Sequence, residues 1–95
     1  MAIKKSARGG TKVLFELPSD IGAREVYLCG DFNDWAPDAT RLRRHQDGRF
    51  SVTLPLEPGS YRYRFLIDGE RWENDWSADD YPPNDYGGHD SLITV

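Results

Sequence analysis

The sequence predicts an all-β protein, an immunoglobulin-like antiparallel β-sandwich of about seven strands. Short stretches in which apolar and polar residues alternate recur along the chain, and turn-forming residues separate them about every 8–12 residues. No segment has the sustained apolar periodicity of an amphipathic helix. The 95 residues are enough for one small hydrophobic core, and therefore for one domain.

The first expected strand covers residues 12–17, where apolar residues alternate with polar ones until Pro18 ends the pattern. Residues 1–10 precede it and are basic, polar and glycine-rich, so we expect them to form a flexible tail. Residues 11–95 then form the sandwich domain. A second strand is expected over 25–30.

The turn that follows the second strand surrounds one large apolar anchor, Phe32. Farther along, Asp68-Gly69 is a tight hairpin signal. Residues 74–90 form a long loop rich in Asp, Pro, Gly and Tyr, and loops of this kind are usually functional or disordered. The other strands are expected over residues 41–45, 50–56, 61–67, 70–73 and 91–95.

Composition excludes several classes of partner. The net charge of −4 argues against nucleic-acid binding, and no apolar run approaches the ~20 residues of a membrane span. Cys29 is the only cysteine, which rules out an intrachain disulfide and is typical of a reducing compartment. Residues 1–10 lack the apolar core of a signal peptide, so we expect a cytoplasmic location.

The sequence lacks the motifs of common catalytic sites. It contains no glycine-rich phosphate loop or nucleophile elbow, and no nearby Arg or His lowers the pKa of Cys29. We therefore expect a non-catalytic protein without a cofactor. His45 and His89 lack the further ligands of a zinc site, so no metal is expected. Calcium binding by loop 74–90 is a weaker alternative, because the loop lacks the Gly and terminal Glu of an EF-hand.

Tryptophan and arginine residues outside the expected core are typical of a sugar-binding surface. Trp35 stands in a polar loop, where it either lies near the surface or folds back as a lid on the core. Trp72 lies either in the core or on the outer surface of its sheet, whereas Trp76 is expected to pack within the acidic loop. Because successive side chains of a strand point to opposite faces, Arg62 and Arg64 are expected to point outward. A flat ring can cover the apolar face of a sugar, and arginine can donate hydrogen bonds to its hydroxyls.

Two stretches, Val26–Trp35 and Pro58–Trp72, resemble carbohydrate-binding module family 48 in their order and spacing. This family includes the glycogen-binding domain of the AMP-activated protein kinase β subunit and the early-set domains of isoamylases and branching enzymes. Its most specific motifs correspond to Gly-Asp-Phe-Asn-Asp-Trp over 30–35 and Tyr-Arg-Tyr-Arg-Phe-Leu-Ile-Asp-Gly over 61–69. The resemblance covers about residues 12–95 and implies an early-set sandwich that binds α-1,4-glucans such as glycogen, starch or maltooligosaccharides.

The resemblance also implies which residues bind the glucan. Two tryptophans would form the sugar platform, an arginine on the strand between them would contact hydroxyls, and an aromatic residue of the late loop would complete the rim. Asp90 stands where the family has an asparagine, and Gly88 where it has a hydroxyl-bearing residue, so the polar contacts differ. The implied carbohydrate-binding residues are Trp35, Arg64, Trp72, Tyr86 and Asp90.

Two functions fit these patterns. The leading hypothesis is a non-catalytic module that binds α-glucan through the two tryptophans and the arginine. The alternative is an early-set protein-interaction module that docks on a glycogen-metabolising enzyme or kinase without binding glycan itself. Exposed aromatic rings favour the first, because a purely structural module does not need them.

Overall fold

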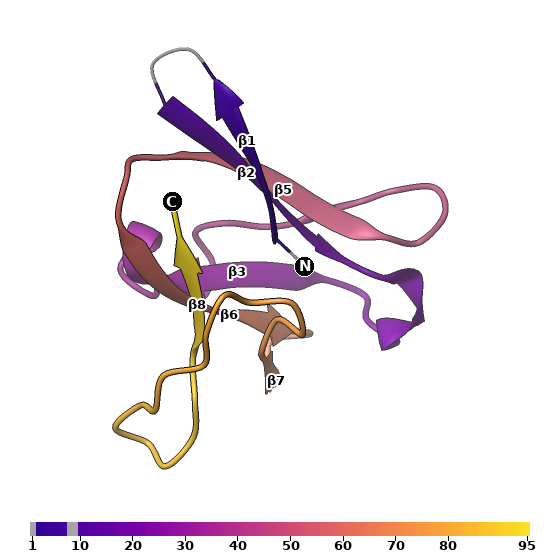
Figure 1. The fold of residues 1–95 in the computed structure, drawn as a ribbon. Helices are drawn as coiled ribbons and strands as arrows, with labels where there is room; N and C mark the ends of the chain where they lie inside the picture. Colours follow the sequence, from indigo (N-terminus) through magenta and orange to yellow (C-terminus); the bar gives the residue numbers. More distant parts are fainter. Residues whose placement is uncertain (1, 8–9) are drawn as a thin grey trace.

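The computed structural model describes residues 2–7 and 10–95, and its regular secondary structure is almost entirely β-strand (Figure 1). Two 3-10 helices, η1 (Ser19–Ile21) and η2 (Asp31–Asn33), are the helical elements of the described residues. No helix in this part of the chain is long and apolar enough to cross a membrane. The strands are β1 (Ala2–Ala7), β2 (Gly10–Leu17), β3 (Val26–Gly30), β4 (Arg43–Arg44), β5 (Phe50–Leu56), β6 (Ser60–Ile67), β7 (Arg71–Glu73) and β8 (Ser91–Thr94).

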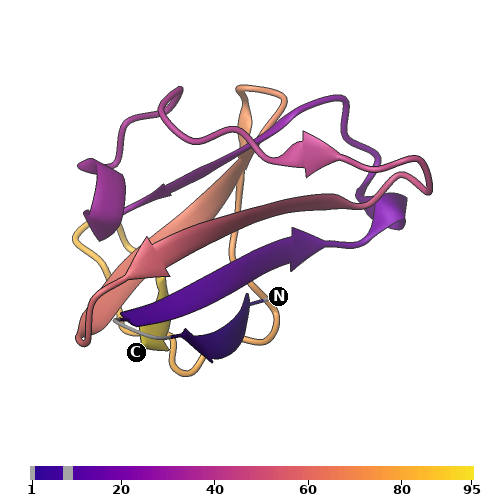
Figure 2. The same cartoon turned by 90° about the horizontal axis from the view of Figure 1, so that it is seen from above.

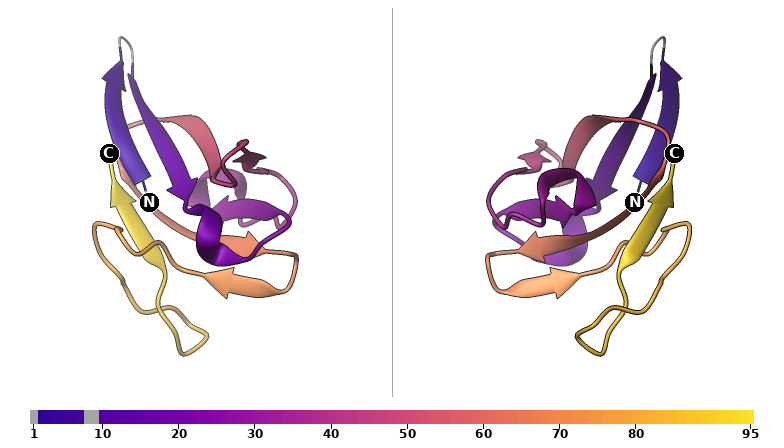
Figure 3. Two further views of the ribbon diagram at one scale, coloured as in Figure 1. Left: turned by 90° about the vertical axis from the view of Figure 1, so that its right-hand side faces the viewer. Right: turned by 90° about the vertical axis from the view of Figure 1, so that its left-hand side faces the viewer.

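These strands form two antiparallel sheets, which confirms the predicted all-β sandwich. The first sheet has the order β1-β2-β5-β4. In the second sheet, β6 pairs with β3 along one edge and with β7 and β8 along the other. The two layers face each other in the turned views (Figures 2 and 3). Strand β6 is thus the central strand of the second sheet.

The apolar residues predicted to face inward meet between the two sheets. The ring of Tyr63 contacts the ring of Phe15 edge to face, with centroids 5.2 Å apart, and lies 6.1 Å from Phe65. Phe32, the expected anchor of the turn after β3, packs against Phe15 at a centroid distance of 5.8 Å. Burial of this cluster is the main stabilising contribution in a domain of this size.

The N-terminal segment differs in part from the expected flexible tail. Residues Ala2–Ala7 form strand β1, which pairs with residues 10–15 of β2 in antiparallel register. A backbone ladder can hold a polar edge strand, because its hydrogen bonds do not depend on apolar side chains. Residues 1, 8 and 9 lie outside the described residues, and the domain boundary at residue 10 stays a prediction.

The strand predicted over residues 41–45 is shorter, because the chain changes sheets there. The backbone N–H of Leu42 donates to the carbonyl of Val26 at 2.9 Å, and Arg41 forms an isolated bridge with Tyr27 of β3. Only Arg43–Arg44 then pair with β5 in the other sheet. Each sheet therefore holds only part of the predicted strand.

The outer face of the second sheet carries the arginines and one tryptophan. Tyr63 is fully buried in the core, so its neighbours Arg62 and Arg64 point outward, as alternation predicts. Trp72 of β7 pairs with Leu66 of β6 and is 41% exposed. The sequence predicts that Trp72 lies either in the core or on the outer surface of its sheet, and the structure places it on the outer surface.

Gly30 ends β3 where its backbone passes very close to β6. A Cβ atom at this position would lie 2.5 Å from the carbonyl oxygen of Arg62 and 2.9 Å from the Cβ of Tyr63. Neither atom can move away by side-chain rotation. The φ angle of −174° is accessible to any residue, so the requirement for glycine is one of space.

We predict that Gly30→Ala lowers the free energy of unfolding by about 1–3 kcal/mol, because the overlap forces the two strands apart. Urea unfolding followed by circular dichroism measures the change. Gly88→Ala is the control, since the nearest atoms to its Cβ would be those of the Asn84 amide at 3.7 and 3.8 Å. Its expected change is within about 0.5 kcal/mol. Equal losses in the two variants would contradict close packing at Gly30.

Candidate functional site

A solvent-open cavity of about 880 Å³ lies on the outer face of the second sheet, in the size range of small-molecule sites. We call it the aromatic groove. It brings together all five residues implied by the family resemblance: Trp35, Arg64, Trp72, Tyr86 and Asp90. It is also lined by Arg62, Pro83, Asn84 and Asp85.

The loop after β3 holds Trp35 at the groove. The Oδ1 of Asn33 accepts the Gly30 N–H at 3.0 Å, and its Nδ2 donates to the Leu28 carbonyl at 2.8 Å. Asp34 and Trp35 both adopt left-handed backbone, with φ of 55° and 58°. These constraints turn the half-buried Trp35 toward the outer surface, which excludes the alternative of a lid on the core.

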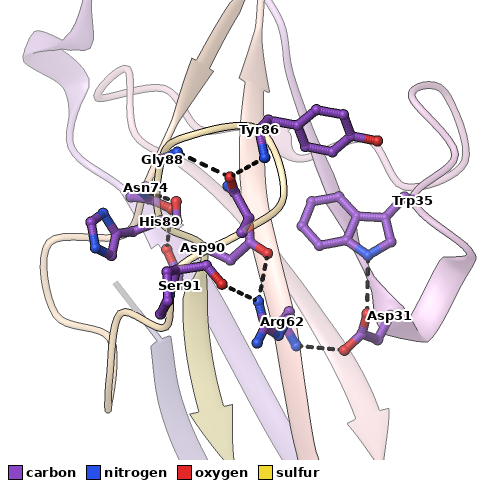
Figure 4. Close-up of polar contacts among 11 residues, drawn as sticks. Asp31, Trp35, Arg62, Asn74, Tyr86, Gly88, His89, Asp90 and Ser91 are labelled. Atoms are coloured by element: carbon purple, nitrogen blue, oxygen red, sulfur yellow. Dashed lines mark hydrogen bonds and ion pairs between the residues drawn. The ribbon is translucent and has the colours of Figure 1, made fainter.

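Asp31 fixes the direction of the Trp35 indole. The indole Nε1–H donates to Oδ1 of Asp31 at 3.0 Å (Figure 4). The other oxygen, Oδ2, accepts the backbone N–H of Arg62 at 2.8 Å. One carboxylate therefore joins the loop after β3 to strand β6. Because the polar edge of the indole is satisfied within the protein, the ring presents an apolar face to the groove.

Arg64 and Trp72 form a second, adjoining part of the groove. The Cζ of Arg64 lies 5.9 Å from the centroid of the Trp72 ring, within range of a cation–π contact. The buried Nε of Arg64 has no hydrogen-bond partner among the described residues. A donor in this state can be satisfied by a polar ligand.

The late loop, residues 74–90, is tied to the core through Asp75, which is 0% exposed. The hydroxyl of Tyr63 donates to Oδ2 of Asp75 at 2.7 Å, and the Asp75 N–H donates to the Ser91 hydroxyl at 2.9 Å. Burial, followed by the hydrogen bond to Asp75, raises the pKa of Tyr63 far above its ordinary value. Tyr63 is therefore a neutral donor, and it positions the loop from inside the sandwich.

Asn84 shapes the tip of the late loop. Its Oδ1 accepts the backbone N–H groups of Tyr86 at 3.0 Å and Gly88 at 3.1 Å. The backbone N–H of Asn84 also donates to the Gly88 carbonyl at 2.9 Å. Tyr86 is 94% exposed at this ordered tip, and its ring lies on the side of Trp35 in Figure 4.

Both carboxylate oxygens of Asp90 already accept hydrogen bonds from the protein. Oδ1 accepts from Nδ2 of Asn84 at 3.1 Å, and Oδ2 accepts from Nη1 of Arg62 at 3.3 Å. Asp90 is only 6% exposed, whereas the sequence predicts a ligand at the rim. Arg62 has no predicted role, although alternation places it beside Arg64. Its pairing with a residue 28 positions away gives no local sequence signal.

The prediction that Trp76 packs within the late loop is wrong. Trp76 is 69% exposed and lies outside the aromatic groove. Asp75 takes the inward position at this point of the loop and accepts the Ser77 N–H at 2.9 Å through Oδ1. The adjacent Trp76 side chain is consequently directed to solvent.

The groove offers stacking and hydrogen bonding. Cys29 is buried nearby on β3, and burial, followed by the charge of Asp38, raises the pKa of its thiol. The thiol donates to the Ala36 carbonyl at a distance of 3.4 Å, so it stays protonated beneath the Trp35 loop. Among the described residues, no group of three or more His, Cys, Asp or Glu side chains could hold a metal ion.

Residues 11–94 match the family described as the glycogen recognition site of AMP-activated protein kinase. The chain belongs to this family. The matched region contains both loops and all the strands that build the aromatic groove. The family membership confirms the resemblance identified from the two sequence motifs.

Curated relatives of this glycogen-recognition module are longer proteins. FLOURY ENDOSPERM 6, chloroplastic, from Oryza sativa subsp. japonica is 43% identical over 53 residues, which are 56% of this chain and 10% of that protein. PTST homolog 2, chloroplastic, from Arabidopsis thaliana is 34% identical over 74 residues, 77% of this chain and 13% of that protein. The 5'-AMP-activated protein kinase subunit beta-1 of Sus scrofa is 41% identical over 54 residues, 57% of this chain and 41% of that protein.

A solved structure also shares the fold. The maltogenic amylase from S. marinus superposes with a TM-score of 0.74 and 26% sequence identity. The superposition covers 92% of this chain and 14% of the amylase chain. The sandwich of this module is therefore similar to a small part of a much larger amylase.

We predict that Tyr63→Phe lowers the free energy of unfolding by about 1–3 kcal/mol, because the buried Asp75 carboxylate loses one donor. Chemical unfolding at neutral pH measures this loss. The raised pKa means that Tyr63 binds its proton more tightly in the folded state. Its contribution is present below the unfolded pKa of about 10 and falls as pH rises above that value. Above this pH, the parent should lose stability more steeply than the variant, and parallel curves would contradict the assignment.

Proposed function

We propose that the aromatic groove binds an α-1,4-glucan chain by stacking glucose rings on Trp35 and Trp72. The supporting observation is that one loop and two strands bring these two rings and Arg64 to one open groove. Glycogen, starch and maltooligosaccharides are the proposed ligands. A neutral polysaccharide is compatible with the net charge of −4, since stacking and hydroxyl contacts do not require a charged ligand.

In this proposal, Arg64 contacts sugar hydroxyls beside the stacked rings. Its guanidinium lies over Trp72, so a sugar against the accessible part of that ring comes within reach of the cation. Arginine has only donors, which suits the lone pairs of hydroxyl oxygens. Tyr86 adds a further aromatic surface from the opposite loop.

The expected affinity for one short oligosaccharide is modest. Each aromatic contact contributes ~1 kcal/mol beyond the buried area. Two such contacts and a few hydrogen bonds correspond to a dissociation constant of about 1 μM to 1 mM, or roughly −8 to −4 kcal/mol. A polysaccharide with many equivalent chain ends would raise the apparent affinity by multiple attachment.

We propose that the groove binds without catalysis. Hydrolysis of a glycosidic bond needs two carboxyl groups, one as acid and one as base or nucleophile. The groove lining carries two carboxylates, Asp85 and Asp90, and Asp90 is paired with Arg62 and accepts a further hydrogen bond from Asn84. Asp85 alone does not supply the pair of carboxyl groups that hydrolysis needs, which favours a binding module.

A glycogen-metabolising enzyme or kinase, in a cytoplasmic setting, is the proposed protein partner. The beta-1 relative is by name a kinase subunit, and the similar amylase carries this fold as 14% of its chain. A recognition module that does no chemistry acts by bringing such an activity to glucan. Trp76, which is 69% exposed outside the groove, is available for a protein contact.

We predict that Trp35→Ala and Trp72→Ala each raise the dissociation constant for glycogen about 10-fold, equivalent to about 1.4 kcal/mol. Affinity electrophoresis in gels with increasing glycogen measures these constants. Trp76→Ala is the matched control: it removes an exposed tryptophan outside the groove and should migrate like the parent. Equal retardation of all four proteins would refute the two-tryptophan platform.

A further inference from the structure

The two loops that border the aromatic groove are joined by one continuous series of hydrogen bonds. Trp35 lies on the loop after β3, and Tyr86 lies at the tip of the late loop. The series runs between them through Arg62 on β6, beneath both rings in the view of Figure 4. No local sequence pattern predicts this connection.

We propose that Arg62 and Asp90 are positioning residues that fix the separation of Trp35 and Tyr86, and thereby set how tightly the groove holds a glucan chain. This inference rests on the proposed function of the groove. Asp90 acts through the late loop and does not use its carboxylate to bind the sugar.

On the Trp35 side, the link uses the backbone of Arg62. The two oxygens of Asp31 are divided between the Trp35 indole at 3.0 Å and the Arg62 N–H at 2.8 Å. The Asp31 carboxylate therefore connects the Trp35 indole to the main chain of β6. Substitution of the Arg62 side chain leaves this half of the series in place.

On the Tyr86 side, the link uses the side chain of Arg62. Its Nη1 donates to the Pro83 carbonyl at 3.0 Å and to Asp90 Oδ2 at 3.3 Å. Asp90 Oδ1 then accepts from Asn84, whose own Oδ1 holds the Tyr86 N–H. The tip of the late loop is therefore fastened to the same residue as Trp35.

The link between Arg62 and the late loop is buried at its Asp90 end. The Asp90 side chain is 9% exposed and that of Arg62 is 40% exposed. Breaking such a pair leaves a poorly solvated carboxylate without its cation, which is strongly unfavourable. Because the two charges offset each other, the pair adds no net charge to the groove.

Asp90 is 6% exposed and its two oxygens accept from Arg62 and Asn84, so Asp90 influences binding by holding the loop that carries Tyr86. Two measurable consequences follow. Removing the Asp90 carboxylate should loosen the loop tip in the absence of ligand. It should also weaken glucan binding only as long as Tyr86 is present, since residues acting through one structural element are not additive.

The test compares the parent with Asp90→Ala, Tyr86→Ala and the double variant. Amide hydrogen exchange by NMR, without ligand, reports on the Tyr86 and Gly88 N–H groups that Asn84 holds. Calorimetric titration with maltoheptaose reports on affinity. Asp85→Ala is the matched control for exchange, because it removes an exposed carboxylate from the same tip and leaves the Arg62–Asp90 pair intact.

We expect exchange at Tyr86 and Gly88 to become about 10-fold faster in Asp90→Ala and to change by less than about twofold in Asp85→Ala. Maltoheptaose affinity should fall about 3- to 10-fold in Asp90→Ala, and the double variant should bind no more weakly than Tyr86→Ala within about twofold. If Asp90→Ala does not fold, Asp90→Leu removes both acceptor oxygens and keeps the branched shape of the side chain, and the same comparisons decide the question.

Unchanged exchange in the folded Asp90 variant would overturn the positioning role. Losses of affinity that multiply in the double variant would overturn it as well, because they would show that Asp90 contacts the sugar independently of Tyr86. A parent that binds no maltoheptaose would instead contradict the proposed function. Faster exchange would then still establish the structural link, so the two failures can be told apart.

Discussion

The alternation of side chains along β6 is the constraint on which both the core and the groove depend. Tyr63 points inward, where it contacts Phe15 and donates to Asp75 of the late loop. Its neighbours Arg62 and Arg64 point outward into the groove. A slip of one residue would exchange these positions, and pairing of β6 with three strands prevents it.

Strand β6 underlies the groove, and the two loops that border the groove are hydrogen-bonded to this strand from both faces of the sheet. Tyr63 holds the late loop from within the sandwich, and Arg62 holds the same loop from the outer surface. Asp31 connects the opposite loop to the same strand. Aromatic surfaces on loops can therefore be exposed and still ordered, which lowers the entropic cost of binding a flexible polysaccharide.

The sequence predicts the local parts of this design well. The alternation of apolar and polar residues defines β5 and β6, and the Gly30–Trp35 motif predicts an anchored turn, with Trp35 either near the surface or folded over the core. The strand and turn features depend on side-chain periodicity and turn chemistry, which are properties of short segments. The five groove residues, which also lie together, are implied by the family resemblance.

The remaining features depend on pairings between distant segments. The edge strand β1 is held by a backbone ladder that its polar sequence does not reveal. The pairing of Arg62 with Asp90, and the exposure of Trp76 next to buried Asp75, follow from how the late loop folds against β6. A single sequence holds little information about such contacts, because many acidic residues could pair with any one arginine.

The most direct test of the glucan-binding groove is an NMR titration with maltoheptaose that follows the three tryptophan indole N–H signals. Stacking on the groove predicts that the Trp35 and Trp72 signals shift together along one saturable curve, while the Trp76 signal stays in place. Shifts confined to Trp76, or no shift at ligand concentrations up to about 10 mM, well above the expected dissociation constants, would contradict it.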